Sequence, residues 1–321
     1  MNNLKTPTRY NAFVSSRSET QIFNMASLAA PTITLRRYPG WYFGIAEAKP
    51  KDKLTFLRIA IWHYCHQHQL TQPLVMEWYD KLRIHAYLGN DISRLLFIDG
   101  YYEPNEFVLL ASILKPGMTF LDIGANDGLY SLFASQYVGS SGQVLAFEPS
   151  QREFHRLQDN IRLNRLANIK SRQIGLYNVN GNLAFQIAGY EHEGQNTLGG
   201  FIYNGVNPEK VENVIVRRLD DLVIEEQLDR IDVIKMDVEG AEHAVLEGAH
   251  NLLQKQKPII LLELSDNALQ KQGSSAAETL SFLRSLGYDI YSFNKINGQL
   301  TKSPDDTNLS DNVVASASPL I

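Results

Sequence analysis

Short apolar runs alternate with segments of helical periodicity over the second half of the chain, and this alternation constrains the fold most. Apolar strands are expected near residues 169–174, 231–236 and 258–264. Nearly unbroken apolar runs are typical of strands buried on both faces, and strand–helix alternation indicates parallel strands joined by crossover helices. The sequence therefore predicts an α/β fold with a mostly parallel sheet.

Other elements of this predicted domain follow from hydrophobic spacing and from the positions of glycine and proline. Helices are expected at residues 107–114, 129–137, 151–164 and 279–286. Strands are expected at 118–121, 143–147 and 288–293, with a short edge strand at 313–315. A strand pair is expected at 182–187 and 213–216, joined by the long glycine-containing loop 189–212.

A loop with three acidic or amide residues and two glycines follows the strand at 118–121. It consists of Asp122-Ile-Gly124-Ala125-Asn126-Asp-Gly128, and Glu148 lies 20 positions after Gly128, at the end of the next strand. Glycines allow the backbone to approach a ligand, the following helix points N–H groups at it, and an acid at this spacing binds ribose hydroxyls. The pattern predicts a nucleoside-containing cofactor.

Two features of this loop favour S-adenosylmethionine over a dinucleotide. Ala125 and Asn126 stand where the second glycine of Gly-x-Gly-x-x-Gly would be. Asp122 precedes the first glycine, and its carboxylate would repel a pyrophosphate but attract the ammonium group of a methionine moiety. An NAD-type Rossmann oxidoreductase is the alternative, and a purely structural turn capped by Asp122 is a third interpretation.

Carboxylates follow two of the predicted buried strands. Asp237 and Glu239 come after 231–236, and Glu263 lies near the end of 258–264. Ligands of open α/β sheets bind at the carboxyl ends of the strands, so we expect these acids to cluster beside the cofactor.

From about residue 101 to 293 the chain resembles the FkbM family of S-adenosylmethionine-dependent methyltransferases. The segments that carry the resemblance are Tyr102-Glu-Pro104, Leu121-Asp-Ile-Gly-Ala-Asn-Asp-Gly128, Ala146-Phe-Glu-Pro149, Asn160-Ile-Arg-Leu-Asn164, Asn196-Thr-Leu198, Arg218-Leu-Asp-Asp221, Ile234-Lys-Met-Asp-Val-Glu-Gly-Ala-Glu242, Leu246-Glu-Gly-Ala249 and Leu261-Leu-Glu-Leu264. The block ending at Glu242 is the most discriminating, because generic methyltransferases do not share it.

The resemblance implies a Rossmann-like methyltransferase fold, with a mostly parallel seven-stranded sheet and an antiparallel late strand. It also implies O-methylation of a small-molecule acceptor, often a hydroxyl on a sugar or a natural product. A homologue that binds the cofactor but has lost its chemistry is the further alternative.

Within this interpretation the acid cluster is the predicted catalytic centre. A carboxylate can accept the hydroxyl proton while positioning supplies much of the rate. We rank Asp237 first as the base and Glu239 second, with Asp237 also near the cofactor. Glu239 has a structural alternative, which is to complement a helix dipole, and Glu263 has another, as a hydrogen-bond acceptor. No metal site is predicted, and Mg²⁺ is the weaker alternative.

Two histidines are further candidates for a general base because imidazole titrates near neutral pH. His192 lies in the long loop and His243 one turn into a helix, although surface histidines without a role are commoner. The remaining assignments depend mainly on the resemblance. It places Gln173 and Gly175 near the adenine, Pro149 beside Glu148, Tyr102 and Glu103 over the methionine end, and Asn196 in the loop that covers the ligands.

The net charge, the cysteine content and the length of the apolar runs argue against several other functions and locations. The net charge of −5 argues against a protein that binds nucleic acid by neutralising phosphates. The single cysteine, Cys65, excludes a disulfide within the chain and is typical of a reducing compartment. No apolar run is long enough to span a membrane, and residues 1–27 lack a secretory pattern, so we expect a cytoplasmic protein.

Residues 1–100 are expected to form an N-terminal extension to a methyltransferase domain of residues 101–321. We expect loose order in 1–35, helices over 53–65 and 76–82, and two strands near 84–88 and 95–98. Its aromatic residues fit an acceptor cap, a homodimer contact or ordinary packing. We favour ordinary packing with a share in the acceptor pocket.

Overall fold

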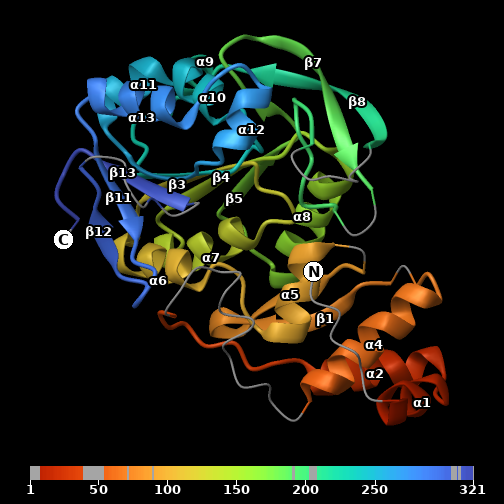
Figure 1. The fold of residues 1–321 in the computed structure, drawn as a ribbon. Helices are drawn as coiled ribbons and strands as arrows, with labels where there is room; N and C mark the ends of the chain where they lie inside the picture. Colours follow the sequence, from red (N-terminus) through yellow and green to blue (C-terminus); the bar gives the residue numbers. More distant parts are fainter. Residues whose placement is uncertain are drawn as a thin grey trace.

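A twisted eight-stranded sheet runs through the middle of the molecule in this computed structural model (Figure 1). The structure describes residues 8–38, 54–70, 72–88, 90–189, 192–201, 208–304, 309 and 312–320. The strands are, in spatial order, β12 (Leu300–Lys302), β11 (Asp289–Phe293), β13 (Asn312–Ser316), β10 (Ile259–Glu263), β9 (Val233–Met236), β3 (Thr119–Ile123), β4 (Gln143–Phe147) and β5 (Ile169–Arg172).

The order of these strands confirms the predicted Rossmann-like methyltransferase fold. The five strands from β10 to β5 are parallel, and β13 runs antiparallel between β10 and β11. The short β12 adds an eighth strand beside β11. β3 pairs with β4 on one side and β9 on the other, so the chain changes direction across the sheet at β3. In open α/β sheets, ligands bind at such a switch point.

Two predictions about the position of a strand within the sheet were wrong. Residues 313–315 belong to β13, which has a partner strand on each side and therefore lies inside the sheet. The segment 169–174 was expected to be buried on both faces, but β5 is an edge strand with alternating exposed residues. Its sequence, Ile-Lys-Ser-Arg, fits an edge because half of its side chains contact solvent.

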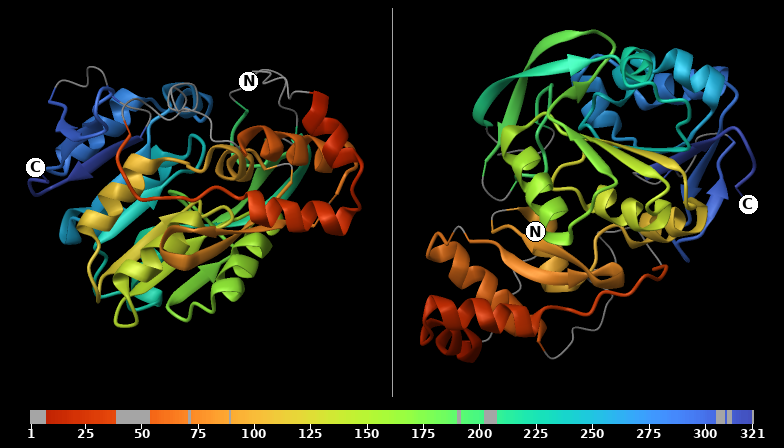
Figure 2. Two further views of the ribbon diagram at one scale, coloured as in Figure 1. Left: turned by 90° about the horizontal axis from the view of Figure 1, so that it is seen from below. Right: turned by 180° about the vertical axis from the view of Figure 1, so that it is seen from behind.

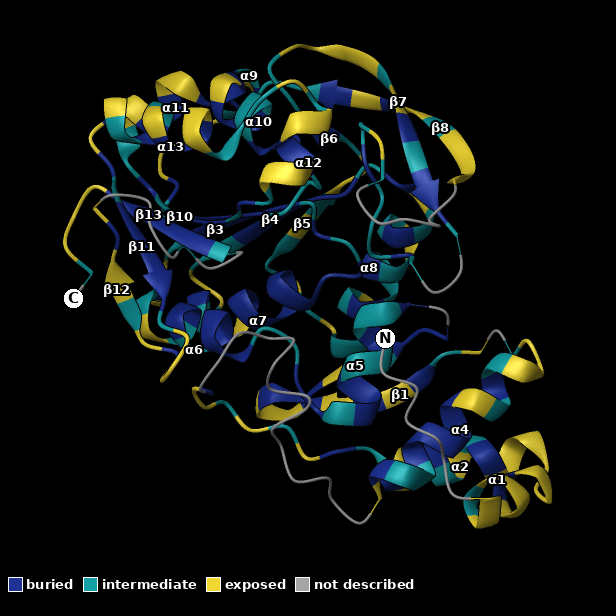
Figure 3. Cartoon of the chain, viewed as in Figure 1, coloured by how far each residue is buried: buried dark blue, intermediate teal, exposed yellow. Residues whose placement is uncertain are grey.

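Helices cover both faces of the sheet, and alternate strand residues contact them. Phe120 of β3 joins one hydrophobic cluster, whereas Leu121 and Ile123 join the other. Figures 1 and 2 show α6 (Pro104–Ile113), α7 (Leu129–Val138) and α8 (Gln151–Asn164) on one face, and α9 (Leu219–Glu225), α10 (Glu242–Gly248), α11 (His250–Gln256) and α13 (Ala276–Ser285) on the other. The central strands β3, β4 and β9 are buried between these layers, while α11 and α13 expose their outer faces (Figure 3).

A smaller three-stranded sheet lies beside the main one. The predicted strand pair is confirmed as β7 (Gly181–Ala188) and β8 (Pro208–Arg217), which are antiparallel, and β6 (Gly175–Leu176) pairs with β8. The described part of the loop between β7 and β8 folds back, because Thr197 and Gln186 exchange backbone hydrogen bonds of 3.1 and 2.8 Å. Below, residues 192–201 are called the covering loop.

The N-terminal region is more regular than expected. The helix over 53–65 is confirmed as α4 (Thr55–Gln67). Loose order was wrong for residues 8–29, where Ser18 and Gln21 form a capping box at the start of the second helix. The two helices are α1 (Thr8–Ser15) and α2 (Glu19–Ala29).

The helix expected over 76–82 and the strands expected at 84–88 and 95–98 were wrong. A hairpin forms instead from β1 (Leu74–Trp78) and β2 (Leu82–Ala86), followed by α5 (Asp91–Asp99). In β1 the buried residues alternate, which outweighs the helical spacing. Asn90 caps α5 by accepting a 2.8 Å hydrogen bond from the Ser93 N–H group, and Gly100 ends the helix with a φ of 82°.

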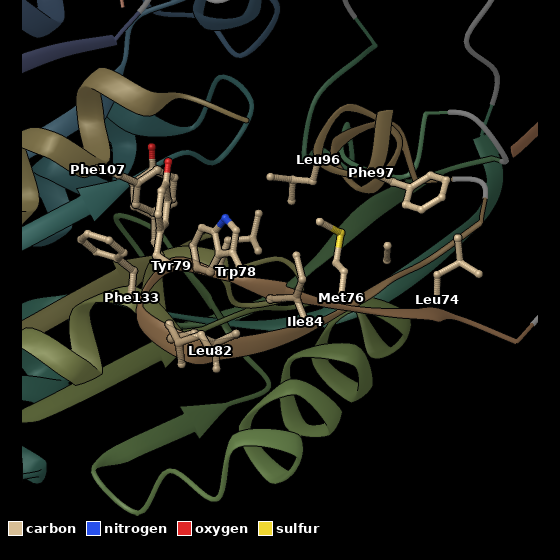
Figure 4. Packing of buried hydrophobic residues seen from close by; sticks show 14 of the residues in the cluster. Leu74, Met76, Trp78, Tyr79, Leu82, Ile84, Leu96, Phe97, Phe107 and Phe133 are labelled. Carbon is tan, nitrogen blue, oxygen red and sulfur yellow. The ribbon is translucent and has the colours of Figure 1, made fainter. Parts of the chain in front are cut away.

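Aromatic packing connects this hairpin to the main domain. The Trp78 ring lies edge-on to Phe107 of α6, with ring centroids 5.1 Å apart, and near Phe133 of α7 at 6.1 Å (Figure 4). Such pairs add about 0.5–1.5 kcal/mol beyond their buried area. The aromatic residues at 41–43 lie outside the described residues. Among the described helices, none has both the length and the apolar character needed to cross a lipid bilayer.

Candidate active site

The glycine loop after β3 is held against the end of β9. Gly124 has a φ of +77°, and a Cβ atom placed there would lie 1.8 Å from the carbonyl oxygen of Asp237. The Gly124 and Ala125 N–H groups both donate 3.0 Å hydrogen bonds to the carbonyl of Phe147. Gly128, with a φ of +95°, then begins α7. The loop thus requires glycine and places the N-terminus of α7 beside the carboxyl end of β9.

Asp122 is completely buried at the end of β3. Its Oδ2 atom accepts a 2.6 Å hydrogen bond from the Ser131 hydroxyl, whereas its Oδ1 atom has no partner among the described residues. Asn126, with a φ of +50°, has a buried side-chain oxygen that is also without a partner there. Buried polar atoms are seldom left unpaired, so both atoms are candidates for contact with a bound molecule.

Glu148 connects the glycine loop to the start of α8. Its Oε2 and Oε1 atoms each accept a 2.9 Å hydrogen bond, from the N–H groups of Asn126 and Ser150 respectively. Each oxygen retains a lone pair for a ribose hydroxyl. Burial, with Glu153 nearby, raises the pKa of Glu148 to about 8.

This raised pKa predicts that the cofactor-free protein loses stability with rising pH. The folded state binds this proton more tightly than the unfolded state, whose ordinary value is 4.5. The contribution is therefore complete below pH 4.5 and is lost as the pH rises through about 8. The slope from one such group is at most about 1.4 kcal/mol per pH unit. Urea denaturation at a series of pH values checks this, and Glu148→Gln should flatten the decline; an unchanged slope would contradict the assignment.

Of the other cofactor candidates, Pro149 and Gly175 lie together. A Cβ atom at Gly175 would be 3.7 Å from the Pro149 Cβ, and Pro149 is half-buried. Gln173 is exposed in the segment that joins β5 to β6. Tyr102 is half-buried. Glu103 accepts hydrogen bonds from the Tyr130 hydroxyl and, at 2.8 Å, from the Asn312 side chain.

Three carboxylates meet at the carboxyl ends of β9 and β10, as predicted. Asp237, Glu239 and Glu263 each offer an oxygen, and these oxygens lie within 4.8 Å of one another. We call them the acid cluster. Gln272 and Thr197 donate hydrogen bonds of 3.0 and 2.8 Å to the backbone carbonyl of Glu239, which attaches the covering loop to the cluster.

The three acids have different electrostatic surroundings. The ammonium group of Lys235 lies 3.0 Å from the Asp237 Oδ2 atom. Among the described residues, no hydrogen bond or ion pair reaches the carboxyl groups of Glu239 and Glu263. Burial and then the negative charge of Asp237 raise the pKa of both glutamates well above the usual range. Three clustered carboxylates are also ligands that suit a divalent cation.

The structure brings the remaining candidates less directly to this cluster. Asn196 accepts a 2.8 Å hydrogen bond from the Ala188 N–H group, so its side chain fastens the covering loop to β7. The ring of His192 has a buried Nδ1 atom without a described partner. His243 contacts α13, with its Nδ1 atom 3.4 Å from the Thr279 hydroxyl and its ring 5.8 Å from that of Phe282.

Lys235 was not predicted as a site residue, although the sequence contains a signal for it. Lys235 is the one basic residue in the apolar segment 231–236, and a charged residue in a buried strand requires partners. Ser131 and Tyr130 were not predicted either, because the contact of α7 with Asp122 and Glu103 forms only when the glycine loop is folded.

The strand order and the glycine loop at the switch point define a Rossmann-like methyltransferase fold. The chain belongs to the FkbM family, because the family model described as "Methyltransferase FkbM domain" matches residues 122–290, more than half of the chain. That range includes the glycine loop, Glu148 and the acid cluster. The chain is thus a methyltransferase by family, as the resemblance predicted.

Two curated relatives are similar over much of their own length. The chain is 29% identical over 188 residues to "2-O-methyltransferase NoeI" of Sinorhizobium fredii (strain NBRC 101917 / NGR234), covering 54% of this chain and 76% of the relative. It is 28% identical over 214 residues to "Methyltransferase 1" of Beauveria bassiana (strain ARSEF 2860), covering 62% and 80%.

Among solved structures, "Methyltransferase FkbM" from Methylobacillus flagellatus KT is 15% identical, with a TM-score of 0.40 over 96% of this chain and 60% of that one.

Proposed function

We propose that this protein transfers the methyl group of S-adenosylmethionine to a hydroxyl group of a small-molecule acceptor, such as a sugar or a natural product. The observation that carries the proposal is the contact between the glycine loop and the acid cluster, where Gly124 lies against the backbone of Asp237. A cofactor on the loop then lies beside carboxylates that can receive a proton. The family supports methyl transfer and does not favour the NAD-type oxidoreductase, and the name of the NoeI relative supports oxygen as the acceptor atom.

For the cofactor, the proposal assigns a role to each group around the glycine loop. The free Oδ1 atom of Asp122 accepts from the ammonium group of the methionine moiety, and Glu148 binds the ribose hydroxyls. The loop residues Gly124, Ala125, Asn126 and Gly128 line the cofactor beside the N-terminus of α7. Pro149, Gly175 and Gln173 flank the adenine, and Tyr102 and Glu103 lie at the methionine end.

On the acceptor side, the three acids of the cluster have different proposed roles. Asp237, paired with Lys235, is the carboxylate that takes the hydroxyl proton. The acceptor oxygen forms a bond to the methyl carbon, the carbon–sulfur bond breaks, and S-adenosylhomocysteine leaves with a neutral sulfur. Burial and the charge of Asp237 raise the pKa values of Glu239 and Glu263, which favours their protonated forms, and a protonated carboxyl group can donate a hydrogen bond that orients the acceptor.

The covering loop completes the acceptor side in this proposal. His192 faces the acceptor, and Asn196 holds the loop on β7. His243 has no catalytic role in this proposal, because its described contacts lie on α13 and on its own helix. The described part of residues 1–100 forms an extension packed on the domain of residues 101–321 in this proposal, and α5 shares in the pocket. A Cβ atom at Gly194 of the loop would lie 2.9 Å from Asp91 Oδ1 at the start of α5, which supports that share.

Two measurements test the proposal. In calorimetry, S-adenosylhomocysteine should bind and NAD should not; binding of NAD alone would restore the oxidoreductase alternative. Labelled S-adenosylmethionine is then incubated with a panel of sugars, polyketides, peptides and lipids, and the methylated atom is located by NMR. Transfer to an oxygen supports the proposal. Binding without transfer to any acceptor supports a non-catalytic homologue, and transfer to nitrogen or carbon contradicts the hydroxyl assignment.

Removal of metal ions provides a further prediction. Because Lys235 already neutralises Asp237, methyl transfer is expected to continue unchanged in excess EDTA. The assay compares initial rates with and without the chelator. Loss of activity that Mg²⁺ restores would instead assign the acid cluster to a metal ion.

A further inference from the structure

Lys235 is a buried charged residue inside an apolar strand. Its side chain is 7% exposed, and in the sheet it lies opposite Asp122 of β3. Its neighbours along β9, Ile234 and Met236, are apolar and buried. An apolar side chain would fill the same position without the free-energy cost of removing an ammonium group from water. The charge therefore calls for an explanation beyond packing.

The ammonium group contacts both halves of the site. It lies 3.0 Å from the Asp237 Oδ2 atom and 4.6 Å from the centre of the Tyr130 ring, which is within the range of a cation–π interaction. Tyr130 in turn donates its hydroxyl hydrogen bond to Glu103. Lys235 thus connects the acid cluster to the residues that surround the glycine loop.

The surrounding charges keep this lysine ionised. Burial opposes the charge, but the carboxylates of Asp237, Asp122 and Glu103 raise the pKa of Lys235 above its ordinary value. Of the three acids in the cluster, Asp237 alone has an ion pair among the described residues. Lys235 therefore forms an ion pair with Asp237 but with neither of the two glutamates.

We propose that Lys235 is a positioning residue for methyl transfer, which holds the Asp237 carboxylate ionised and fixes its orientation through the Oδ2 atom. The proposal rests on the proposed function, in which Asp237 takes the acceptor proton. With Oδ2 engaged by the ammonium group, the other oxygen of Asp237 is left to face the acceptor. The lysine itself touches neither the proton nor the methyl group in transfer.

The first test compares Lys235→Met, which removes the charge at similar volume, with Lys235→Arg, which keeps it. Without the ammonium group, the ionised form of Asp237 is less stable relative to the protonated form. The acid limb of the pH–rate profile in Lys235→Met should therefore move to higher pH by about one to three units. Lys235→Arg should stay near the wild-type profile. Equal losses in both variants at every pH would indicate a structural role and overturn the proposal.

A double-mutant cycle separates this inference from the proposed function. If Lys235 acts through Asp237, Lys235→Met lowers kcat about tenfold or more in the wild type and has little effect in Asp237→Asn. An equal effect in both backgrounds overturns the positioning role. Full activity of Asp237→Asn alone contradicts the base assignment instead, so the two failures are distinguishable.

A chemical readout requires no acceptor. Carbodiimide with glycine ethyl ester modifies protonated carboxyl groups, and Asp237 is accessible because its side chain is 25% exposed. Peptide mass spectrometry at neutral pH should show little labelling of Asp237 in the wild type and in Lys235→Arg, and at least several-fold more in Lys235→Met. If Lys235→Met does not fold, Lys235→Gln takes its place. Equal labelling in all folded variants overturns the proposal.

Discussion

Replacing Asp237 by Asn should lower kcat by about 10²- to 10⁴-fold, because the amide has the size of the carboxylate but cannot take the acceptor proton. The loss should appear in kcat rather than in cofactor affinity, since the proposed function assigns the principal cofactor contacts to Asp122 and Glu148, whose side chains are placed by the glycine loop. Single-turnover transfer from labelled S-adenosylmethionine measures the first quantity, and calorimetry with S-adenosylhomocysteine measures the second. A variant with wild-type turnover and normal cofactor binding would show that Asp237 is not the base.

Glu263→Gln is the matched control for this substitution. Burial and the charge of Asp237 raise the pKa of Glu263 and so favour its neutral form, which can donate a hydrogen bond. The glutamine amide preserves both properties, and most of the turnover should remain. If Glu263→Gln is as inactive as Asp237→Asn, then Glu263 works as a carboxylate and the division of roles in the cluster is wrong.

The second large effect is expected for Gly124→Ala. The new Cβ atom would lie 1.8 Å from the carbonyl oxygen of Asp237, and the φ of +77° is strained for any L-residue with a side chain. Backbone strain costs about 1–2 kcal/mol, and overpacking costs about 1–3 kcal/mol more. A total destabilisation of about 2–5 kcal/mol should appear as a lower Tm, with loss of S-adenosylhomocysteine binding. The carboxyl ends of β3 and β9 must separate to admit the methyl group of the alanine side chain.

Gly273→Ala isolates the contribution of strain. Gly273 has a φ of +81°, but a Cβ atom there would meet no atom within 4 Å. This variant should lose only the strain energy, about 1–2 kcal/mol, and should bind the cofactor normally. Similar losses of stability in both variants would mean that the loop after β3 can relax away from β9, contrary to the close contact described above.

The sequence predicted the elements around the cofactor because strong local signals bound them. The helix at 151–164 and the strand at 143–147 agree with α8 and β4, since Gly142 and Pro149 mark their limits. The meeting of Asp237 with Glu263 was predictable as well. Parallel neighbouring strands place their carboxyl ends at one edge, so acids that follow them must approach each other.

What the sequence left undetermined depends on tertiary contacts. Met76, Tyr79 and Leu82 satisfy a helical spacing, yet Leu74, Met76 and Trp78 also alternate, and packing against Phe107 and Phe133 favours the hairpin. The partner of Lys235 in its ion pair, Asp237, lies only two positions away, but the further charges of Asp122 and Glu103 beside the ammonium group could not be predicted because these residues lie far from it along the chain. The hydrogen bond between Asn196 and β7 likewise depends on how the covering loop folds back.

The position of β13 has a consequence for the order of folding. This strand lies between β10 and β11, which both precede it in the chain, and its residue Asn312 donates a hydrogen bond to Glu103 across 209 positions of sequence. Contacts between residues this far apart in the sequence form slowly, because a long loop must close before the contacts contribute any stabilising free energy. Both β10 and β11 precede β13 in the chain, so the sheet is complete only when β13 has entered between them. The surroundings of Glu103, which we propose to lie at the methionine end of the cofactor, therefore reach their final form only with this last strand.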